Sequence, residues 1–414
     1  MNNIFINIKK IYQPISQSYQ ISKKLIQDLG KHNIKKPKGY CLVSYLPQYV
    51  NFLLNSKNVG KHGWDPVNIA QQSVNLLDSF SYQTINHTMF WNSVEIIRQF
   101  IERDYIVDCI FDRDGYLLKN INKYEVIVDE WNNLLNWRKE NPTAKKLYYA
   151  TGSHWIYHNK AELIRHEWLL NRRGREIPTR RQVPPILSSN VADLIAFNGS
   201  KFNAETYANH SKKIRKLWSH PISTPEVFIE RNWEIARKKF LYFGSTGWVH
   251  RGLDLIIEAF LKEPEFELAI CGRDDGFLDV YGDEIKNSSN IHYFGYISPN
   301  SDLFKKLTVS CGVTIYPSCS EGSSGSVIQC MMFGMIPIVT ENAGIEIHDF
   351  WEPIQGKSDY EFIEEIRNRI HDIASKSPNE LNELSHLFWD YTHTNHSRIS
   401  FRNSLSLILD ELIA

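Results

Sequence analysis

The chain has 414 residues, which is long enough for two or three domains with separate hydrophobic cores. Its formal net charge is zero, so bulk charge predicts neither nucleic-acid binding nor an acidic partner. The six cysteines show neither a Cys-x-x-Cys pair nor metal-ligand spacing, a pattern typical of free thiols in a reducing compartment. No apolar run reaches the ~18–20 residues of a membrane span, and the first residues lack a signal-peptide cleavage site, so we expect a cytoplasmic protein.

The first 39 residues form a basic segment with eight lysines and one aspartate. Two interpretations stay open. The segment is either a partly ordered extension or an electrostatic contact with anionic lipid, which would place the protein at the inner face of a membrane.

In the first half of the chain, short apolar runs of strand length alternate with polar or helical segments. The predicted strands are 41–46, 105–111, 124–128, 146–150 and 193–197. Two helices are expected, one with Val94, Ile97 and Ile101 on one face and one that ends at Gly174. This alternation predicts βαβ units with a parallel sheet, and segment 221–225, with its Pro, Ser and Thr, is the best linker candidate.

The second half repeats the alternation. The predicted strands are 240–244, 266–271, 291–294, 313–316 and 336–340. Apolar residues at helical spacing predict helices over 253–261 and 401–412. Open parallel sheets of this kind bind ligands at the carboxyl ends of their strands.

Four segments therefore divide the chain. We expect a basic extension (1–39), an N-terminal α/β domain (40–225) and a C-terminal α/β domain (226–395). A final helix (396–414) is expected to pack back toward the N-terminal domain. The predicted fold class is α/β.

The stretch 313–344 predicts a strand, a polar loop, a helix from Val327 to Gly334 and a second strand. Glu321 and Gly322 stand in the loop, just ahead of the Ser/Gly-rich segment 323–326 that leads into the helix. Free N–H groups and the positive dipole end at a helix start bind phosphates. A carboxylate beside such a site suggests a ligand with phosphate and hydroxyl groups, and a nucleotide sugar is our hypothesis. Gln329 returns to nearly the same face about 12 Å further along, so it could bracket the ligand together with Glu321. The alternatives are a helix-capping acid and a solvated glutamine.

The loop 244–252 lies between a predicted buried strand and a strongly amphipathic helix. Its glycines would let the backbone approach a ligand, and Arg251 near the helix start is unfavourable there unless an anion joins it. We favour a phosphate contact over a surface arginine at a tight turn. The loop does not end in Gly-Lys-Ser/Thr, so it is not a Walker A sequence.

His154 directly follows a predicted strand, where parallel-sheet folds place functional loops, and His87 stands at a helix start. A structural role is the alternative for each histidine. The cluster Arg172, Arg173, Arg175, Arg180 and Arg181 is a solvated face, an acceptor-phosphate site or a membrane contact. Metal-ligand spacing is missing, so we expect a metal-independent site without a cofactor.

The second half resembles the retaining glycosyltransferases of family 4, which have the GT-B architecture of two facing Rossmann-like domains. The resemblance rests on FGSTGWVHRGLDLIIEAF, LAICGRDD, NIHYFGYI and IYPSCSEGSSGSVIQCMMFGMIPIVTENAG, within residues 240–345. In the first half, NHTMFWNSVEIIRQFIERDYIVDCI and YYATGSHW are similar to the family's first helix with its strand and to the strand before a donor-facing histidine.

The resemblance implies a nucleoside-diphosphate sugar donor held mainly by a Rossmann-like C-terminal domain (226–395), with the acceptor at a Rossmann-like N-terminal domain (40–225). Glu321 would touch hydroxyls of the donor sugar, Gln329 would take the ribose-binding position and Arg251 would contact the diphosphate. His154 would hydrogen-bond donor or acceptor from the opposite wall. The remaining donor-binding residues implied are Gly244, Ser245, Gly295, Ile297, Gly322, Gly325 and Ser326, with Gly295 and Ile297 near the base through their backbone.

Two positions depart from the family pattern: Gln329 replaces the usual Glu, and Ser245 replaces a basic residue. We expect a glycosyltransferase that acts with retention on a hydroxyl of a saccharide or lipid-linked acceptor, in cell-surface polysaccharide or glycolipid synthesis. The two departures motivate a second hypothesis, a non-catalytic GT-B subunit. A sugar-nucleotide epimerase is the third.

Overall fold

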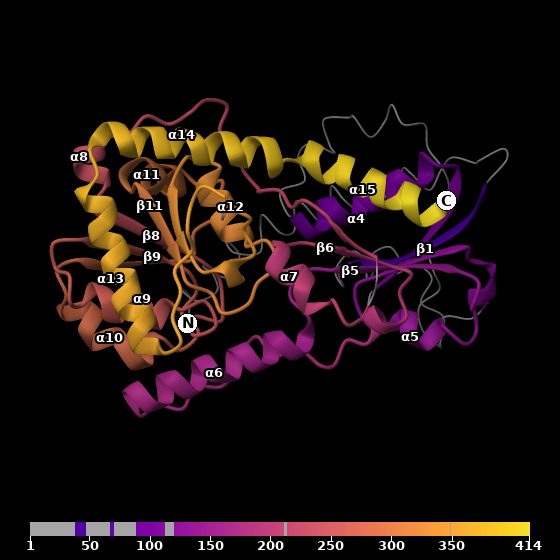
Figure 1. Ribbon diagram of the computed structural model, residues 1–414, viewed down its shortest axis with the longest axis horizontal. Coiled ribbons are helices and arrows are strands. Elements are labelled where there is room, and N and C mark those ends of the chain that lie inside the picture. The colour runs from indigo at the N-terminus through magenta and orange to yellow at the C-terminus, as the bar shows by residue number, and fades with distance from the viewer. Residues whose placement is uncertain (1–37, 47–66, 70–87, 112–119, 211–212, 348) are drawn as a thin grey trace, which may run out of the picture.

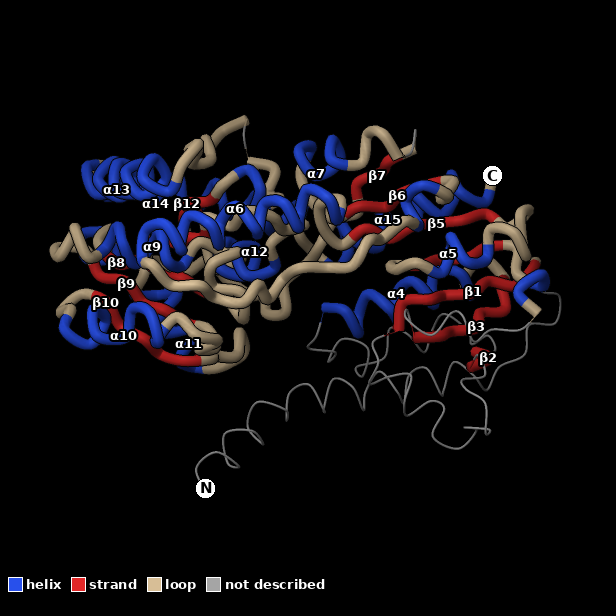
Figure 2. Tube along the Cα trace, turned by 90° about the horizontal axis from the view of Figure 1, so that it is seen from below, coloured by secondary structure: helices blue, strands red, loops and turns tan. Residues whose placement is uncertain are grey.

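The computed structural model describes residues 38–46, 67–69, 88–111, 120–210, 213–347 and 349–414. The basic segment up to residue 37 and His87 lie outside the described residues. Two α/β domains stand side by side, each built around its own sheet (Figure 1, Figure 2).

The N-terminal domain contains a seven-stranded sheet with strand order β2-β3-β1-β4-β5-β6-β7. Its strands are β1 (Gly39–Leu46), β2 (Val67–Ile69), β3 (Tyr105–Phe111), β4 (Val126–Asp129), β5 (Lys145–Ala150), β6 (Leu194–Phe197) and β7 (Ile214–Lys216). Neighbouring strands are parallel except for β2, which runs antiparallel to β3. The helices of this half are α4 (Thr88–Ile101), α5 (Asn133–Trp137), α6 (Trp155–Arg173) and α7 (Lys201–Thr206).

The C-terminal domain has a five-stranded parallel sheet with order β10-β9-β8-β11-β12. Its strands are β8 (Lys239–Phe243), β9 (Glu267–Cys271), β10 (Ile291–Gly295), β11 (Val313–Tyr316) and β12 (Ile336–Val339). Along the chain, β9 and β10 are added on one side of β8, and β11 and β12 on its other side. We call the position between β8 and β11 the reversal point of the strand order. The loops after these two strands diverge, and ligands of such sheets usually bind in the crevice between loops of this kind.

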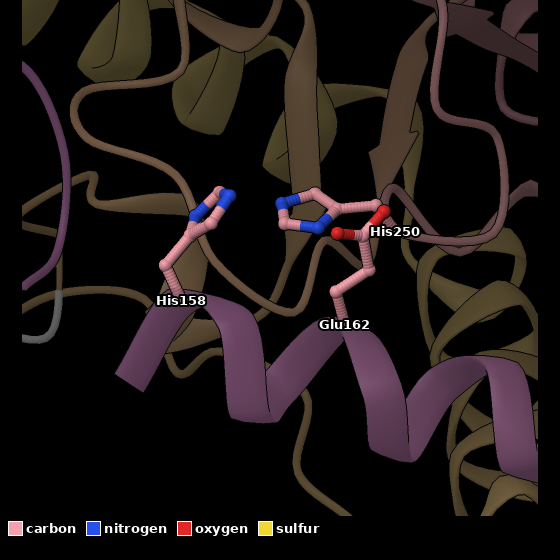
Figure 3. Close-up of side chains that lie close together, drawn as sticks. All are labelled: His158, Glu162 and His250. Atoms are coloured by element: carbon pink, nitrogen blue, oxygen red, sulfur yellow. The ribbon is translucent and has the colours of Figure 1, made fainter. Parts of the chain in front are cut away.

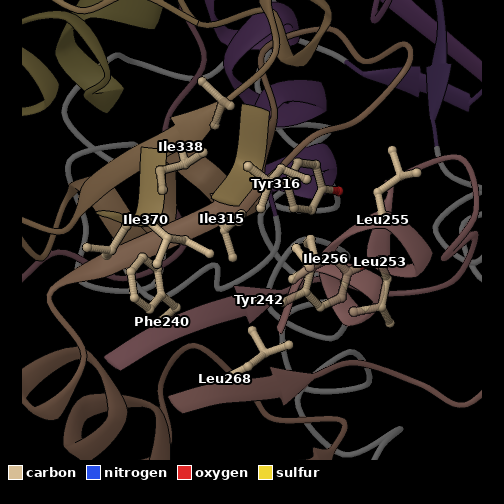
Figure 4. Packing of buried hydrophobic residues seen from close by; sticks show 14 of the residues in the cluster. Phe240, Tyr242, Leu253, Leu255, Ile256, Leu268, Ile315, Tyr316, Ile338 and Ile370 are labelled. Carbon is tan, nitrogen blue, oxygen red and sulfur yellow. The ribbon is translucent and has the colours of Figure 1, made fainter. Parts of the chain in front are cut away.

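Helices surround the second sheet. They are α8 (Trp233–Ala236), α9 (Leu253–Phe260), α10 (Leu278–Asn287), α11 (Asp302–Ser310), α12 (Gly325–Met331), α13 (Asp359–Ser375) and α14 (Pro378–Asn395). The apolar face of α9 packs on the sheet because Leu253 and Ile256 are buried in one cluster with Phe240 and Ile315 (Figure 4). Full burial of such side chains contributes roughly 1.5–3 kcal/mol each to the stability of the fold. This packing fixes the position of α9 and therefore the end of the loop that precedes it.

Two helices at the end of the chain connect the domains (Figure 1). α14 packs on the C-terminal domain through Leu381 and Phe388. α15 (Arg398–Ile413) returns to the N-terminal domain, where Phe401 and Leu405 share a core with Trp91 of α4. Among the described helices, none has the combination of length and apolar composition that crossing a bilayer requires.

The long helix α6 follows a strand of the N-terminal sheet but runs along the C-terminal domain (Figure 1). Leu169 is fully buried in the C-terminal core. Arg172 bonds three carboxylates of that domain, those of Asp254, Glu258 and Asp359. Two members of the arginine cluster, Arg172 and Arg173, therefore dock α6 rather than meet solvent or membrane.

Arg173 offers a mild test of this docking. Its guanidinium contacts Glu258 at 2.6 Å and Glu284 at 2.7 Å and lies over the ring of Tyr281. Because these groups are partly exposed, we expect Arg173→Gln to lower the free energy of unfolding by only about 1 kcal/mol. Urea denaturation measures this loss. Arg175→Gln, the same change at an exposed position, should leave stability unchanged, and an equal loss in both variants would contradict the docking role.

Candidate functional site

Glu321 lies in the loop after β11, at the reversal point of the C-terminal sheet. Its Oε1 accepts hydrogen bonds from Arg251 Nε at 3.1 Å and Tyr316 Oη at 3.2 Å, and Arg181 Nη2 is 3.8 Å from its Oε2. Burial alone would raise the pKa of Glu321, but Arg251 and Arg181 outweigh it and lower this pKa to about 2. The carboxylate is therefore negatively charged at neutral pH.

Arg251 comes from the loop after β8 and is buried. Gly252 follows it with a φ of 72°, and a Cβ there would be 2.7 Å from the carbonyl oxygen of Pro317, so only glycine fits this close approach. Burial alone would lower the pKa of Arg251, but Tyr316 and Glu321 raise it above its ordinary value. The two loops thus hold a guanidinium and a carboxylate together, although the residues are 70 positions apart in the chain.

A cavity of about 210 Å³ opens beside this ion pair, and we call it the donor-side cavity. Five of the predicted site residues line it: Arg251, Glu321, Gly325, Ser326 and Gln329. Thr88 of α4 and the linker segment around Pro221 form the opposite wall, so both domains contribute. The structure therefore brings the main predicted donor contacts into one place.

Five other predicted donor contacts do not line this cavity, and one of them, Gly322, lines the second cavity described below. Gly244 follows β8, and its N–H donates to the carbonyl of Cys271 at 2.8 Å, while Ser245 beside it is exposed. Gly295 ends β10 with a φ of 73°, and Ile297 is buried in a hydrophobic cluster of the C-terminal domain. Any contact from them to a ligand would lie outside the donor-side cavity.

Gln329 lies on α12 and has both ends of its amide engaged by the interdomain linker. Its Oε1 accepts from the backbone N–H of Ile222 at 2.9 Å and of Ser223 at 3.0 Å, and its Nε2 donates to the carbonyl of Ser223 at 2.7 Å. The side chain is buried. The residue expected at the ribose thus holds the linker in this structure.

A second cavity of about 260 Å³ lies on the other side of Glu321, and we call it the acceptor-side cavity. Ser320, Glu321 and Gly322 form its C-terminal wall. The N-terminal wall comes from the carboxyl ends of β4 and β5 and from segment 180–183. Its aromatic lining consists of Trp131, Tyr148, Trp155 and Tyr207. Glu321 is shared by both cavities.

His154 does not line either cavity. It forms the N-cap of α6, where its Nδ1 accepts from the N–H of Ile156, and its ring stacks on His210 at 4.0 Å. Burial lowers the pKa of His154 to about 4, with a smaller contribution from His210. His158, one turn later on α6, lines the acceptor-side cavity instead. Its spacing of four from His154 is the only sequence signal that could have found it.

We therefore expect His154→Asn to keep activity and to change pH dependence. Asn is a strong N-cap, so the helix start is retained. Since the pKa of His154 is below its ordinary value, the unfolded state binds more protons between pH 6.5 and 4, and wild-type stability falls as pH falls through this window. Between pH 7 and pH 5, the free energy of unfolding of the variant should fall by about 1–2 kcal/mol less than that of wild type. Urea unfolding at both pH values checks this.

The exposed His292 provides the control, because His292→Asn is the same change on β10. This variant should keep the wild-type pH dependence. A loss of turnover in His154→Asn without a loss of folded protein would contradict the structural role and restore His154 as a catalytic candidate.

His158, Glu162 and His250 gather behind the acceptor-side cavity, with one ligating atom of each within 4.8 Å of the others (Figure 3). A metal ion accepts such a set, but each residue already has a protein partner, although Glu162 Oε2 has no hydrogen bond among the described residues. The Nε2 atoms of both histidines face carbonyl oxygens, of Arg181 and of Ser320. Burial lowers the pKa of both rings, so they are neutral at pH 7.

Glu162 is fully buried on α6, and its role follows from its bonds. Its Oε1 accepts from the backbone N–H of Arg180 at 3.0 Å and of Arg181 at 2.8 Å. His158 Nε2 bonds the carbonyl of Arg181 at 2.6 Å. Together they fix the backbone from which the Arg181 side chain reaches Glu321. Sequence reasoning missed this arrangement because it depends on how α6 docks.

Known proteins resemble this chain in fold. Residues 225–347 match the family described as Glycosyl transferases group 1, and no curated protein sequence matches the chain. The structure of the pneumococcal O-GlcNAc transferase GtfA in complex with UDP and GlcNAc is 12% identical with a TM-score of 0.50. The match covers 72% of this chain but only 59% of GtfA.

The structure of Anabaena Alr3699/HepE in complex with UDP is 10% identical, with a TM-score of 0.51, and the match covers 75% of this chain and 87% of HepE. HepE in complex with UDP-glucose gives 12% identity and a TM-score of 0.50, over 76% of this chain and 88% of HepE. At such identities the likeness establishes the fold. The chain has the GT-B fold of these glycosyltransferases, and its C-terminal domain carries the match to glycosyl transferases group 1.

Proposed function

We propose that this protein is a glycosyltransferase that moves a sugar from a nucleoside-diphosphate donor to a hydroxyl acceptor, with retention at the anomeric carbon. The observation that carries the proposal is the position of Glu321. Its charged carboxylate lines both cavities and is bonded to Arg251. Residues of both domains line each of these cavities. A sugar that passes from one cavity to the other would be in contact with this carboxylate.

The donor-side cavity supplies the groups that a departing diphosphate needs. Arg251 brings a positive charge that cannot be titrated away, and Gly325 and Ser326 at the start of α12 line the same space. Such prearranged donors act where charge develops in the transition state and usually contribute the largest catalytic effect. Glu321 would orient the sugar hydroxyls. Because Arg251 provides the positive charge in this proposal, we expect turnover to persist in EDTA.

UDP-sugars are the donors to test first, because GtfA and HepE were solved with UDP. Isothermal titration with UDP-, GDP- and ADP-sugars measures donor binding, and NMR of the product reports the anomeric configuration. Tight binding of one donor, followed by transfer with retention, is the expected result. An inverted product would contradict retention alone, and silence toward every nucleotide would contradict the whole proposal.

One observation favours a second candidate, a non-catalytic GT-B subunit that binds a partner or a sugar. The amide of Gln329 is bonded to the linker and is not open to a ribose. The third candidate, a sugar-nucleotide epimerase, would convert its donor without any acceptor. Product analysis therefore distinguishes it from a glycosyltransferase. We also propose that the glycosyltransferase works in cell-surface polysaccharide or glycolipid synthesis, in the cytoplasm near the inner membrane face.

A further inference from the structure

The acceptor-side cavity has the chemistry of a sugar site and also contains two arginines. Tryptophan and tyrosine rings line it, together with polar loops at the carboxyl ends of β4 and β5. Aromatic faces pack on sugar rings, and the loops supply hydrogen-bonding groups around them. The guanidinium groups of Arg180 and Arg181 are in the same lining. The question is which ligand these cations would meet.

Two buried donors in this lining have no hydrogen-bond partner among the described residues: Trp155 Nε1 and Arg181 Nε. The Arg181 guanidinium has one ion-pair contact, at 3.8 Å from Glu321, whereas Arg172 is bonded to three carboxylates. Unpaired buried donors are costly, so most such groups find an acceptor. Both unpaired groups donate, so they favour a ligand rich in acceptor oxygens.

The charges around the cavity do not use up Arg181. Glu321 already has Arg251 at 3.1 Å, so its charge is balanced from the donor side. The other carboxylate in the lining, that of Glu130, accepts from Thr151 Oγ1 at 3.0 Å. The carboxylate of Asp275 attracts Arg180, whereas Arg181 has its ion-pair contact with Glu321 at 3.8 Å. An anion in the cavity would give Arg181 a closer partner.

The position of Arg181 is fixed by the protein. Glu162 and His158 hold its backbone, and its aliphatic stem lies against Gly247, where a Cβ would be 2.7 Å from Arg181 Cγ. A side chain at residue 247 would displace the arginine. Such preorganisation is typical of a binding residue, because less conformational entropy is lost when the ligand arrives.

We infer that the acceptor-side cavity binds an anionic saccharide, a sugar that carries a carboxylate or a phosphate, with Arg181 as its anion-binding residue. This inference rests on the proposed function, in which the sugar in this cavity is the acceptor. A planar guanidinium can pair with a carboxylate or a phosphate through two parallel hydrogen bonds. Trp155 Nε1 would donate to another oxygen of the same sugar. Glu162 is a positioning residue that acts through Arg181.

The test compares charged and neutral sugars without any nucleotide. Methyl β-glucuronide is titrated against methyl β-glucoside, and glucose 6-phosphate against glucose, with binding followed by saturation-transfer NMR. We expect at least one anionic sugar to bind about tenfold tighter than its neutral partner. Arg181→Gln should remove this preference. Arg175→Gln removes the same charge outside the cavity and should behave as wild type.

Glu162→Gln provides a second variant, because it weakens the anchoring of Arg181 without removing the guanidinium, and it should lower the anionic preference less than Arg181→Gln does. Equal binding of charged and neutral sugars, or no binding of either anion up to ~10 mM, would overturn the inference. An equal loss in Arg175→Gln would overturn it as well. Tighter binding of methyl β-glucuronide than of glucose 6-phosphate would identify the charged group of the ligand as a carboxylate, and the reverse order would identify it as a phosphate. Failure of the nucleotide titration would instead overturn the proposed function.

Discussion

Replacing Glu321 with glutamine is expected to lower kcat for sugar transfer by about 10²–10³-fold, the usual cost of removing one electrostatic contact at a reacting centre. Glutamine keeps the size of the side chain but loses the charge that holds Arg251 at 3.1 Å and attracts Arg181 at 3.8 Å. The guanidinium groups would lose their common partner, and the sugar would lose a charged hydrogen-bond acceptor. Initial rates of UDP release in the presence of acceptor measure the effect.

The pH dependence of this loss follows from the pKa of Glu321. Since that pKa is about 2, below its ordinary value, the carboxylate stabilises the folded state above pH 4.5, and this contribution is lost as pH falls toward 2. Between pH 6 and pH 8 the group stays charged, so the activity ratio of wild type to Glu321→Gln should not change. A ratio that depends on pH in this range would mean that Glu321 exchanges a proton during catalysis.

Glu383→Gln is the matched control, because it removes one carboxylate from an exposed position on α14. Its activity should stay within about twofold of wild type. Circular dichroism of both variants separates lost chemistry from lost folding. If Glu321→Gln folds and turns over at the wild-type rate, Glu321 does not contact the reacting sugar, and its proposed role in transfer is wrong.

The sheets could be predicted from the sequence where apolar runs are continuous. The predicted bounds of β3 and β11 are confirmed to the residue, because both are short runs rich in apolar residues between clear breaks. β2 and β7 were not predicted. β7 has one apolar residue, Ile214, and becomes a strand through pairing with Ile195 of β6, which is a tertiary contact.

The helix after Glu321 also differs from its prediction. The pattern indicated a helix from Val327 to Gly334, whereas α12 covers Gly325–Met331. The start differs because Gly325 and Ser326 have low helix propensity but lie in the first turn, which Ser324 precedes as N-cap. The end differs because the last residues before Gly334 form a turn, and Gly334 has a φ of 74°.

The candidate site could be predicted only within one domain. Glu321 and Arg251 follow strands β11 and β8, and loops at the same edge of a parallel sheet must lie close together. Arg181 and His158 reach the site from the other half of the chain. Their approach depends on how α6 docks on the C-terminal domain, which no local pattern encodes. Gln329 was found by motif, but its partners are backbone groups without a sequence signature.

Gln329 is the residue at which the resemblance and the structure lead to opposite expectations, so its replacement by glutamate is decisive. In the structure, Nε2 donates to the carbonyl of Ser223, and a carboxylate oxygen there would face that carbonyl without a proton. We therefore expect Gln329→Glu to lower the free energy of unfolding at pH 7–8 by about 2–4 kcal/mol and to loosen the linker. Urea denaturation measures the loss, and proteolysis at the linker reports the loosening.

Acid should restore part of this stability, which separates the linker role from a ribose role. A protonated glutamate can donate to Ser223 and accept from Ile222, as the amide does. The pKa of the new carboxyl should therefore be raised in the folded state, so stability is retained below about pH 4.3 and lost as pH rises. Gln329→Met, of similar volume, loses the hydrogen bonds without adding charge and should be destabilised at every pH. If Gln329→Glu is instead as stable as wild type and binds UDP more tightly, Gln329 contacts the ribose and the linker bonds are dispensable.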